Sequence, residues 1–364
     1  MCLLWPKARP RFGSFRAGTG RCGAGWAATG SCQRWRLPTE TRPNAKHFVK
    51  PSYSVARAYQ AAAYPALYLF HYFMATTFRR VFQVIDGNKK LVGDGFDVTS
   101  PMPGPRIRQL SPYLLIDHIG PMQIAPTDTP LGSPPHPHRG FETVTVVYAG
   151  HLAHRDTAGH DGSIGPGDVQ WMTAGAGLRH AEMYDRDFAR RGGTLELLQL
   201  WVNMPKADKL VAPKYQELRA ASIPSVALPD GQSSIRVIAG SYAGATGPGS
   251  TFSPITLLDL HLAAGADFVL TLPAHYNVGL YVVRGAVLVG DRPATTQQLV
   301  VLGWNSTDVQ ITAAEDSLVL VLAGAPIEEP LATYGPFVMN SNEELMEAIA
   351  DFENGNMGKF PEDE

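Results

Sequence analysis

The chain has 364 residues, of which 45% are hydrophobic and 18% charged, and its formal net charge is −2. A chain of this length buries at least one large core, and we expect two domains. The near-neutral balance offers no basic stripe, so direct nucleic-acid binding is not expected. The 36 glycines and 29 prolines indicate many turns, as in a protein of short β-strands rather than a helical bundle.

Residues 1–80 differ in composition from the rest of the chain. Residues 1–50 hold ten Lys or Arg and one acid, and all three cysteines of the chain lie here. No disulfide can therefore hold the rest of the chain together. Basic, acid-poor composition is typical of an organellar targeting segment, while a translation start at Met74 is an equally open interpretation. We expect this extension to be disordered.

An apolar run, Tyr64–Met74, lies inside this extension. It is shorter than the roughly 20 residues that a membrane-spanning helix needs, so we expect no contact with a membrane. The expected location is the cytoplasm, or the nucleus or an organelle if the extension is a targeting segment.

Two later stretches each hold a pair of candidate metal ligands. SPPHPHRGFETV contains His136 and His138, and WMTAGAGLRHAEM contains His180 and Glu182. In a β-strand, residues two apart project from the same face, so each pair aims at one point. Two such strands side by side supply three imidazoles and a carboxylate, a set suited to iron, manganese, nickel, copper or zinc.

Either pair alone is more often structural, because histidine has many roles other than metal binding. Two observations favour a metal site. The pairs occur together, and seven of the eleven histidines of the chain lie between His118 and His180. A purely structural use would spread them along the chain.

Between the two pairs, FETVTVVYAGHL alternates as a strand does, with Thr143, Thr145 and Val147 on one face. A Gly-Pro-Gly-Asp turn at residues 165–168 follows, and the small residues of TAGAG at 173–177 allow close approach of the backbone before His180.

The second half of the chain contains further short runs rich in Val, Ile and Leu, which predict a second barrel. HYNVGLYVVRGAVLVGD, from His275 to Asp291, occupies the place equivalent to the first histidine pair and its strand, which indicates a weak internal duplication. Asn277 stands where the second histidine would be, so we expect this barrel to bind no metal.

One clear helix is expected at the end of the chain. Ser341 precedes Glu344 by three residues, a capping-box signature, and an apolar face with Leu345 and Phe352 follows before Gly355.

The runs HPHRGFETVT and GPGDVQWMTAGAGLRHAEM resemble the pirin family of the cupin superfamily, and the resemblance extends from about Val81 to the end of the chain. It implies two β-barrels and one non-haem metal, usually iron. It places the metal ligands on His136, His138, His180 and Glu182. Glu142, where many other cupins place a carboxylate ligand, is then expected beside the ligands rather than among them.

The resemblance also places the segment PYLLIDHIGP along the metal pocket. Asp117 and His118 are therefore candidates for lining it, with plain structural burial as the alternative. His154 and His160, which also match pirin sequences, lie in a turn-rich loop and are expected to form hydrogen bonds at the surface.

We therefore expect an all-β bicupin, two jelly-roll barrels packed face to face with short helices. The expected domains are the extension at 1–80, a metal-binding barrel at 81–205 and a degenerate barrel with the terminal helix at 206–364. Fold alone does not assign function in this superfamily.

Two functions remain open from the sequence. One is a quercetin 2,3-dioxygenase-like oxygenase with iron (Fe²⁺/Fe³⁺) or another divalent transition metal, in which Glu182, or else Glu142, deprotonates a flavonol or similar aromatic. The other is a metal- and redox-dependent transcription cofactor that acts through a protein partner. A monomer is expected in either case.

Overall fold

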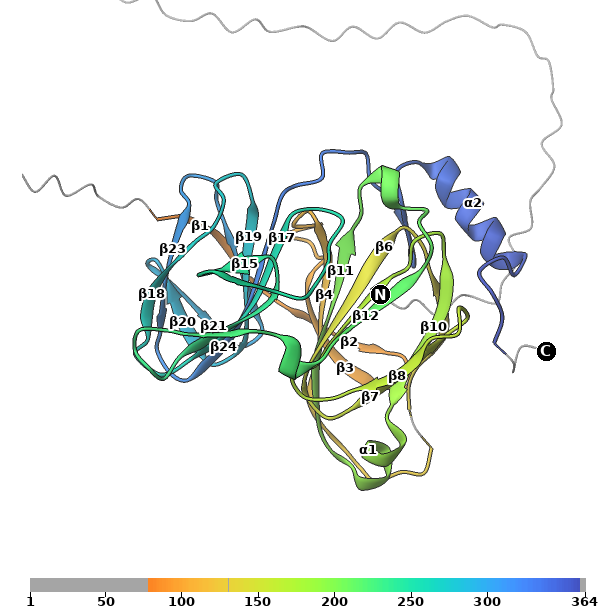
Figure 1. Ribbon diagram of the computed structural model, residues 1–364, viewed down its shortest axis with the longest axis horizontal. Coiled ribbons are helices and arrows are strands. Elements are labelled where there is room, and N and C mark those ends of the chain that lie inside the picture. The colour runs from red at the N-terminus through yellow and green to blue at the C-terminus, as the bar shows by residue number, and fades with distance from the viewer. Residues whose placement is uncertain (1–77, 130, 361–364) are drawn as a thin grey trace, which may run out of the picture. The chain divides into compact units, whose positions relative to one another are not determined.

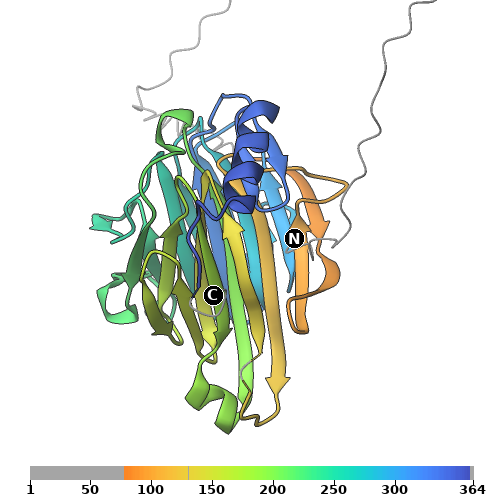
Figure 2. The same cartoon turned by 90° about the vertical axis from the view of Figure 1, so that its right-hand side faces the viewer.

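The computed structural model describes residues 78–129 and 131–360 (Figures 1 and 2). The expectations for the basic extension and its apolar run thus fall almost entirely outside the described residues. Within them, the strands form two barrels, each built from one seven-stranded and one four-stranded antiparallel sheet. The all-β, two-barrel prediction is confirmed.

The first barrel contains the histidine pairs. Its seven-stranded sheet runs, in spatial order, β12 (Lys214–Leu218), β9 (Val169–Thr173), β6 (Phe141–Ala149), β11 (Gly193–Asn203), β4 (Tyr113–Ile124), β3 (Phe96–Met102) and β2 (Asn88–Val92). Its four-stranded sheet runs β5 (Gly132–His138), β10 (Leu178–Tyr184), β7 (Leu152–Asp156) and β8 (Asp161–Ile164).

The second barrel repeats this order. Its large sheet runs β1 (Val81–Asp86), β22 (Gln298–Leu302), β19 (Asn277–Arg284), β24 (Ser317–Gly324), β17 (Ile255–Leu262), β14 (Ser234–Ala239) and β13 (Ser225–Ala227). Its small sheet runs β18 (Asp267–Thr271), β23 (Asp308–Ala313), β20 (Ala286–Val289) and β21 (Arg292–Thr295). β19 thus corresponds to β6, which agrees with the predicted duplication, whereas the counterpart of the histidine strand β5 is β18 and not the segment that contains His275.

Shorter elements complete the described chain. They are α1 (Arg186–Arg191), the single-turn helices η1 (Lys206–Asp208) and η2 (Ala220–Ser222), β15 (Ser241–Tyr242), β16 (Ala245–Thr246), β25 (Ala332–Tyr334), β26 (Phe337–Met339) and α2 (Asn342–Glu353). The capping box predicted for Ser341 and Glu344 is present at the start of α2. None of the described helices is long and apolar enough to cross a membrane.

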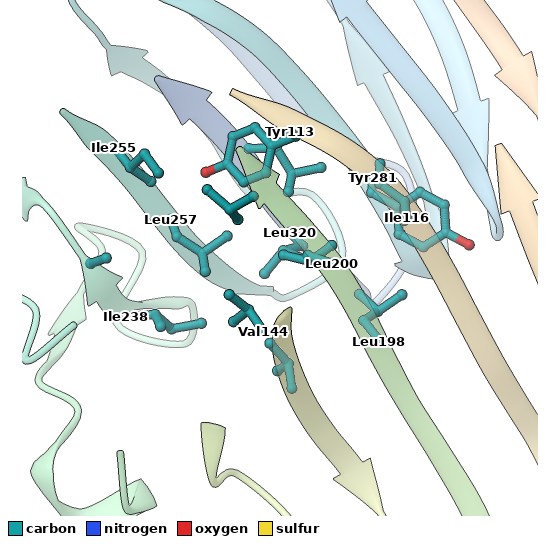
Figure 3. Packing of buried hydrophobic residues seen from close by; sticks show 14 of the residues in the cluster. Tyr113, Ile116, Val144, Leu198, Leu200, Ile238, Ile255, Leu257, Tyr281 and Leu320 are labelled. Atoms are coloured by element: carbon teal, nitrogen blue, oxygen red, sulfur yellow. The ribbon is translucent and has the colours of Figure 1, made fainter. Parts of the chain in front are cut away.

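The two large sheets pack face to face through a shared apolar core. It joins Val144 and Leu200 of the first barrel to Leu257 and Leu320 of the second, as Figure 3 shows. The central strands are therefore buried on both faces, one against their own barrel and one against the other barrel. This explains why β24, SLVLVLAG, is apolar almost throughout instead of alternating.

The edges of the large sheets do not follow the predicted domain boundaries. β1 comes before the first barrel in sequence yet pairs with β22 of the second. β12 lies in the segment predicted to link the barrels, yet it pairs with β9 and extends the first barrel to Leu218. The predicted boundaries at 81 and 205 therefore place β1 with the first barrel and β12 with the second, the reverse of their pairing, because an edge strand's own pattern does not specify its partner.

The C-terminal segment returns to the first barrel. The ring of Phe337 and helix α2 form one apolar cluster with Met357, and Thr157 of the first barrel donates to the carbonyl oxygen of Met357 over 2.7 Å. We call residues 332–360 the C-terminal strap. The terminal helix thus belongs spatially with the first barrel and not with the second.

Candidate metal centre

Two neighbouring strands of the small sheet carry the predicted ligands. β5 and β10 pair antiparallel, with His136 directly opposite His180. A shift in register between His180 and Glu182 makes the strand irregular where the ligands converge. The prediction that the two motifs lie side by side on adjacent strands is confirmed.

The three imidazoles meet at one point inside the barrel. One ring nitrogen each of His136, His138 and His180 lies within 4.8 Å of the others. The Nε2 atoms of His136 and His180 are 3.0 Å apart. Phe141 and Trp201 lie edge-on to the His138 ring, with centroids at 5.1 and 5.4 Å, so an apolar wall supports it.

The chemistry of these donors fits a transition metal. Nδ1 of His136 is 2.8 Å from the carbonyl oxygen of Pro134, so a proton on Nδ1 leaves the Nε2 lone pair directed at its neighbours. Burial, reinforced by the neighbouring histidines, holds the pKa of both His138 and His180 well below the usual value. Neutral imidazole is the form that binds metal.

Glu182 is the nearest carboxylate, with Oε2 4.0 Å from Nε2 of His180. Gln199 on β11 donates from Nε2 to both of its oxygens, over 3.0 and 2.8 Å, and Thr145 on β6 donates over 3.4 Å. Burial raises the pKa of Glu182, while these hydrogen bonds oppose the rise. The structure therefore brings Glu182 to the histidines and fixes its orientation, and its role as the fourth ligand stays a prediction.

Thr145 and Gln199 belong to a row of polar side chains on the inner face of the large sheet. Gln170, Thr145, Gln199 and Asp117 occupy directly paired positions on β9, β6, β11 and β4. Directly paired residues point to the same side of a sheet. We call these four residues the polar row. Sequence reasoning placed Thr145 on this face but missed Gln199 as a support for Glu182.

A small cavity lies beside Glu182 and is mostly apolar. Its volume is about 30 Å³, which is room for a water molecule. Polar groups reach it from four of its eleven lining residues. The polar ones are Asp117, Ser133, Glu182 and Gln199, and the apolar ones are Val92, Phe96, Val98, Ile119, Leu152, Leu197 and Trp201.

Glu142 lies elsewhere. Its Oε1 accepts a hydrogen bond of 2.8 Å from Thr173, and it alternates along β6 with Thr143 and Thr145, so it faces the shared core between the barrels. Burial raises its pKa to about 7. No hydrogen bond or ion pair among the described residues links Glu142 to the histidines, and its expected place beside the ligands stays a prediction.

Asp117 and His118, expected to line the pocket together, point to opposite faces of β4. Asp117 lines the cavity. His118 instead faces the second barrel, where its ring nitrogens lie 3.0 Å from the Tyr281 hydroxyl and 3.2 Å from Glu196. Of the two alternatives left open for His118, the structure shows structural burial, because adjacent residues of a strand cannot share a face.

His154 and His160, both predicted to lie in a surface loop, differ in their burial. His160 is partly exposed and lies 2.9 Å from Asp156, as expected of a surface histidine. His154 was expected at the surface too but is only 4% exposed, and its ring stacks on Tyr215 at 5.2 Å between centroids.

A buried cation ties the C-terminal strap to the turns that carry the candidate ligands. Arg139, next to His138, donates to the carbonyl oxygen of Ala176 over 2.6 Å and to Asp351 of α2 over 2.7 Å. A Cβ on Gly140 would lie 2.1 Å from the carbonyl oxygen of Val338. The strap therefore packs directly on the backbone that orients the histidines.

Two barrels with one strand order, and a histidine cluster inside the first of them, define the class: the chain is a bicupin. Residues 95–202 match the family described as Pirin, and residues 257–358 match the Pirin C-terminal cupin domain. The chain belongs to the pirin family.

Relatives match over nearly their whole length. A Pseudomonas aeruginosa protein named "Putative quercetin 2,3-dioxygenase" is 46% identical over 271 residues, which cover 74% of this chain and 95% of that protein. A crystal structure of quercetin 2,3-dioxygenase from Acinetobacter baumannii matches with a TM-score of 0.75 and 41% identity over 78% of this chain and 99% of that one.

A more distant structure shares the fold alone. The bacterial pirin YhhW of Escherichia coli, in complex with nickel(II), matches with a TM-score of 0.52 and 22% identity. The match covers 67% of this chain and 99% of that one.

Proposed function

We propose that this protein is a metal-dependent oxygenase of the quercetin 2,3-dioxygenase type that acts on a flavonol or a similar small aromatic. The observation that carries the proposal is the convergence of three imidazoles and Glu182 beside a mostly apolar cavity inside one barrel. The names of the P. aeruginosa and A. baumannii relatives support the same reaction class.

We propose that His136, His138, His180 and Glu182 hold the metal, and that the metal is iron. Three imidazoles and a carboxylate accept several divalent metals, and the nickel(II) in the E. coli pirin makes nickel the main competitor. A bound transition metal would supply Lewis-acid and one-electron chemistry toward dioxygen and a chelating substrate.

The side chains of the pocket divide the remaining work. The neutral imidazoles keep their ring nitrogens directed at one point. A carboxylate oxygen of Glu182 accepts the proton of the substrate hydroxyl, and Gln199 holds that carboxylate through both oxygens. The apolar walls, among them Phe96 and Leu197, exclude water and contact the aromatic rings of the substrate.

We propose a monomer that contacts no nucleic acid.

Metal analysis and oxygen uptake with a flavonol test the proposal. We expect about one metal per chain and flavonol-dependent oxygen consumption, and the double variant His136→Ala/His138→Ala should lose both. His275→Ala, an exposed histidine of the second barrel, is the matched control and should lose neither. If the fully metal-loaded protein consumed no oxygen in the presence of a flavonol, the oxygenase function would be overturned. The alternative function, a metal-dependent regulatory protein, would then stand. Full metal retention in the double variant would overturn the metal site.

A further inference from the structure

Asp117 occupies an unusual place in the cavity beside Glu182. It lies on β4, is only 5% exposed, and lines the cavity together with apolar side chains such as Val98 and Ile119. A buried carboxylate is costly unless it is hydrogen-bonded or paired with a charge. Two neighbours, Ser100 and Lys90, meet that need.

These two partners hold the Asp117 carboxylate in place. The hydroxyl of Ser100 donates to Oδ1 of Asp117, and Nζ of Lys90 lies 3.0 Å from the same oxygen. The Lys90 side chain is 30% exposed. Asp117 therefore contributes the acceptor of an ion pair to the cavity lining, whereas the donor, Lys90, extends toward solvent and is not among the lining residues.

The polar row fixes the spacing between this ion pair and the metal ligands. Glu182 contacts Thr145 and Gln199, and Asp117 is the direct partner of Gln199 on the next strand. Neighbouring strands lie about 4.8 Å apart, so Asp117 is one strand spacing from Gln199 and roughly 10 Å from the strand of Thr145. A ligand whose oxygens face Glu182 meets Asp117 roughly 5–10 Å further along.

The ion pair also restricts the chemistry of the group it can receive. A neutral hydroxyl can donate to Asp117 without adding a charge beside its ion pair with Lys90. A carboxylate would satisfy Lys90 and repel Asp117, and an ammonium would do the reverse. A phenol, with a pKa near 10, is neutral at physiological pH.

Room for such a ligand must come from the β2–β3 hairpin. The cavity of about 30 Å³ is smaller than an aromatic ring system, and Val92, Phe96 and Val98 of this hairpin form one wall of it. At the tip of the hairpin, the amide of Asp94 donates to the carbonyl oxygen of Gly132 over 2.9 Å. One backbone hydrogen bond therefore joins the tip to β5, and outward movement of the tip widens the cavity.

We propose that Asp117 is a specificity-determining residue, which selects ligands bearing a neutral hydroxyl roughly 5–10 Å from the oxygens that face the metal ligands. The proposal rests on the proposed function and narrows its substrate class. Lys90 and Ser100 position the Asp117 carboxylate.

The test compares ligands that share a chelating unit and differ at one remote position. The protein is loaded with zinc, which has no redox chemistry, so flavonol fluorescence reports binding without turnover. The ligands are 3-hydroxyflavone, its 7-hydroxy and 4′-hydroxy derivatives, and its 4′-carboxylate. The wild type should bind one hydroxy derivative roughly 10-fold more tightly than 3-hydroxyflavone, as expected for one hydrogen bond to a charged acceptor. The 4′-carboxylate derivative should bind more weakly than both 3-hydroxyflavone and the preferred hydroxy derivative.

Substitution assigns the preference to Asp117. Asp117→Ala should reduce the ratio between the two affinities to about one. Ser100→Ala, which touches Asp117 outside the ligand position, should lower the ratio only partly. Zinc content confirms that each variant keeps its metal site.

Failure of this inference is distinct from failure of the proposed function. Equal binding of all four ligands by the wild type would overturn the role of Asp117 and leave the flavonol site standing, as would an unchanged ratio in Asp117→Ala. No binding of 3-hydroxyflavone itself would overturn the flavonol site.

Discussion

Gln199 donates from its amide nitrogen to both carboxylate oxygens of Glu182, over 3.0 and 2.8 Å. The two residues come from different sheets of the first barrel, Gln199 from β11 of the large sheet and Glu182 from β10 of the small one. The bond therefore crosses the barrel interior. The carboxylate expected to bind the metal is oriented by the sheet that does not carry the histidines.

Replacing Gln199 by methionine should weaken metal binding by about 10- to 100-fold, the usual effect of losing a residue that orients a ligand. The Glu182 carboxylate would keep only the longer bond from Thr145. Competition with a chelator measures the affinity. Gln216→Met is the matched control, because this amide bonds Ser250 at the rim and should leave the affinity unchanged. Equal affinities in all three proteins would contradict the positioning role.

Glu182 and Glu142, the two carboxylates considered as ligands from the sequence, should differ in how strongly their substitution reduces metal retention. Glu182→Gln should release the metal during dialysis against a chelator, because a neutral amide is a poorer ligand than a carboxylate. Glu142→Gln should retain the wild-type amount, since Glu142 bonds Thr173 on the other face of β6. Elemental analysis after dialysis gives both values, and the reverse ranking would favour Glu142 as the ligand.

Glu142 should instead control the pH dependence of stability. Its pKa is about 7 in the folded protein, against an ordinary value of 4.5, because burial outweighs the bond from Thr173. The folded state therefore holds this proton more tightly than the unfolded chain, and the stabilisation present below pH 4.5 is lost as the pH rises through 7. Glu142→Gln removes that loss.

The free energy of unfolding in urea tests this effect at pH 5 and pH 8. The gain from Glu142→Gln should be on the order of 2 kcal/mol larger at pH 8 than at pH 5. Glu347→Gln, on the exposed face of α2, should show no such difference. A pH-independent gain would mean that the Glu142 carboxyl is not the titrating group.

The positions of the candidate ligands were predictable because their signal is local. Residues two apart on a strand project from the same face. This rule alone predicted, without any knowledge of the fold, that the side chains of His136 and His138 point in the same direction. The capping box of Ser341 and Glu344 is local in the same way. The predicted duplication correctly related β6 to β19, but the order of the strands within each sheet was not predicted.

The faces of the central strands could not be predicted, because both faces are buried. In β11, LELLQLWV, Glu196 faces the second barrel and bonds His118, while Gln199 faces the metal ligands. Both residues are polar, so the sequence shows that both positions are unusual in an apolar strand. Only the packing of the two barrels determines which residue faces the metal ligands and which faces the second barrel. The same ambiguity on β4 left Asp117 and His118 unresolved. The exchange of β1 and the return of the C-terminal strap depend on long-range pairing, which no local pattern encodes.

The strap should contribute to stability through Lys209. This buried lysine donates to the carbonyl oxygens of Gly140 and Val338, over 2.6 and 3.1 Å, and to Oδ1 of Asn203 over 2.6 Å. Lys209→Met leaves three acceptors without their donor and should lower the free energy of unfolding by on the order of 3 kcal/mol. Lys206→Met, an exposed neighbour with one surface ion pair, should cost less than 1 kcal/mol. Similar losses in the two variants, measured in urea, would contradict the role of Lys209.

The first 73 residues should be dispensable for folding and metal binding. They lie outside the described residues, and their basic, acid-poor sequence offers little periodic apolar surface to offset the entropy of ordering. A chain that begins at Met74 should therefore have the same thermal midpoint and the same metal content as the full chain. A lower midpoint would show that the extension packs on the barrels.

The matched control begins seven residues later, at Val81, and removes Arg79. The guanidinium of Arg79 is buried against the second barrel and donates to four carbonyl oxygens, those of Pro273, Ala274, Tyr276 and Gly303, over 2.6 to 3.2 Å. Without it these four carbonyl oxygens lose a charged donor next to the edge strand β1. The chain from Val81 should therefore melt several degrees lower than the chain from Met74, although its metal site in the first barrel is unchanged. Equal midpoints would show that Arg79 does not anchor the N-terminal strand.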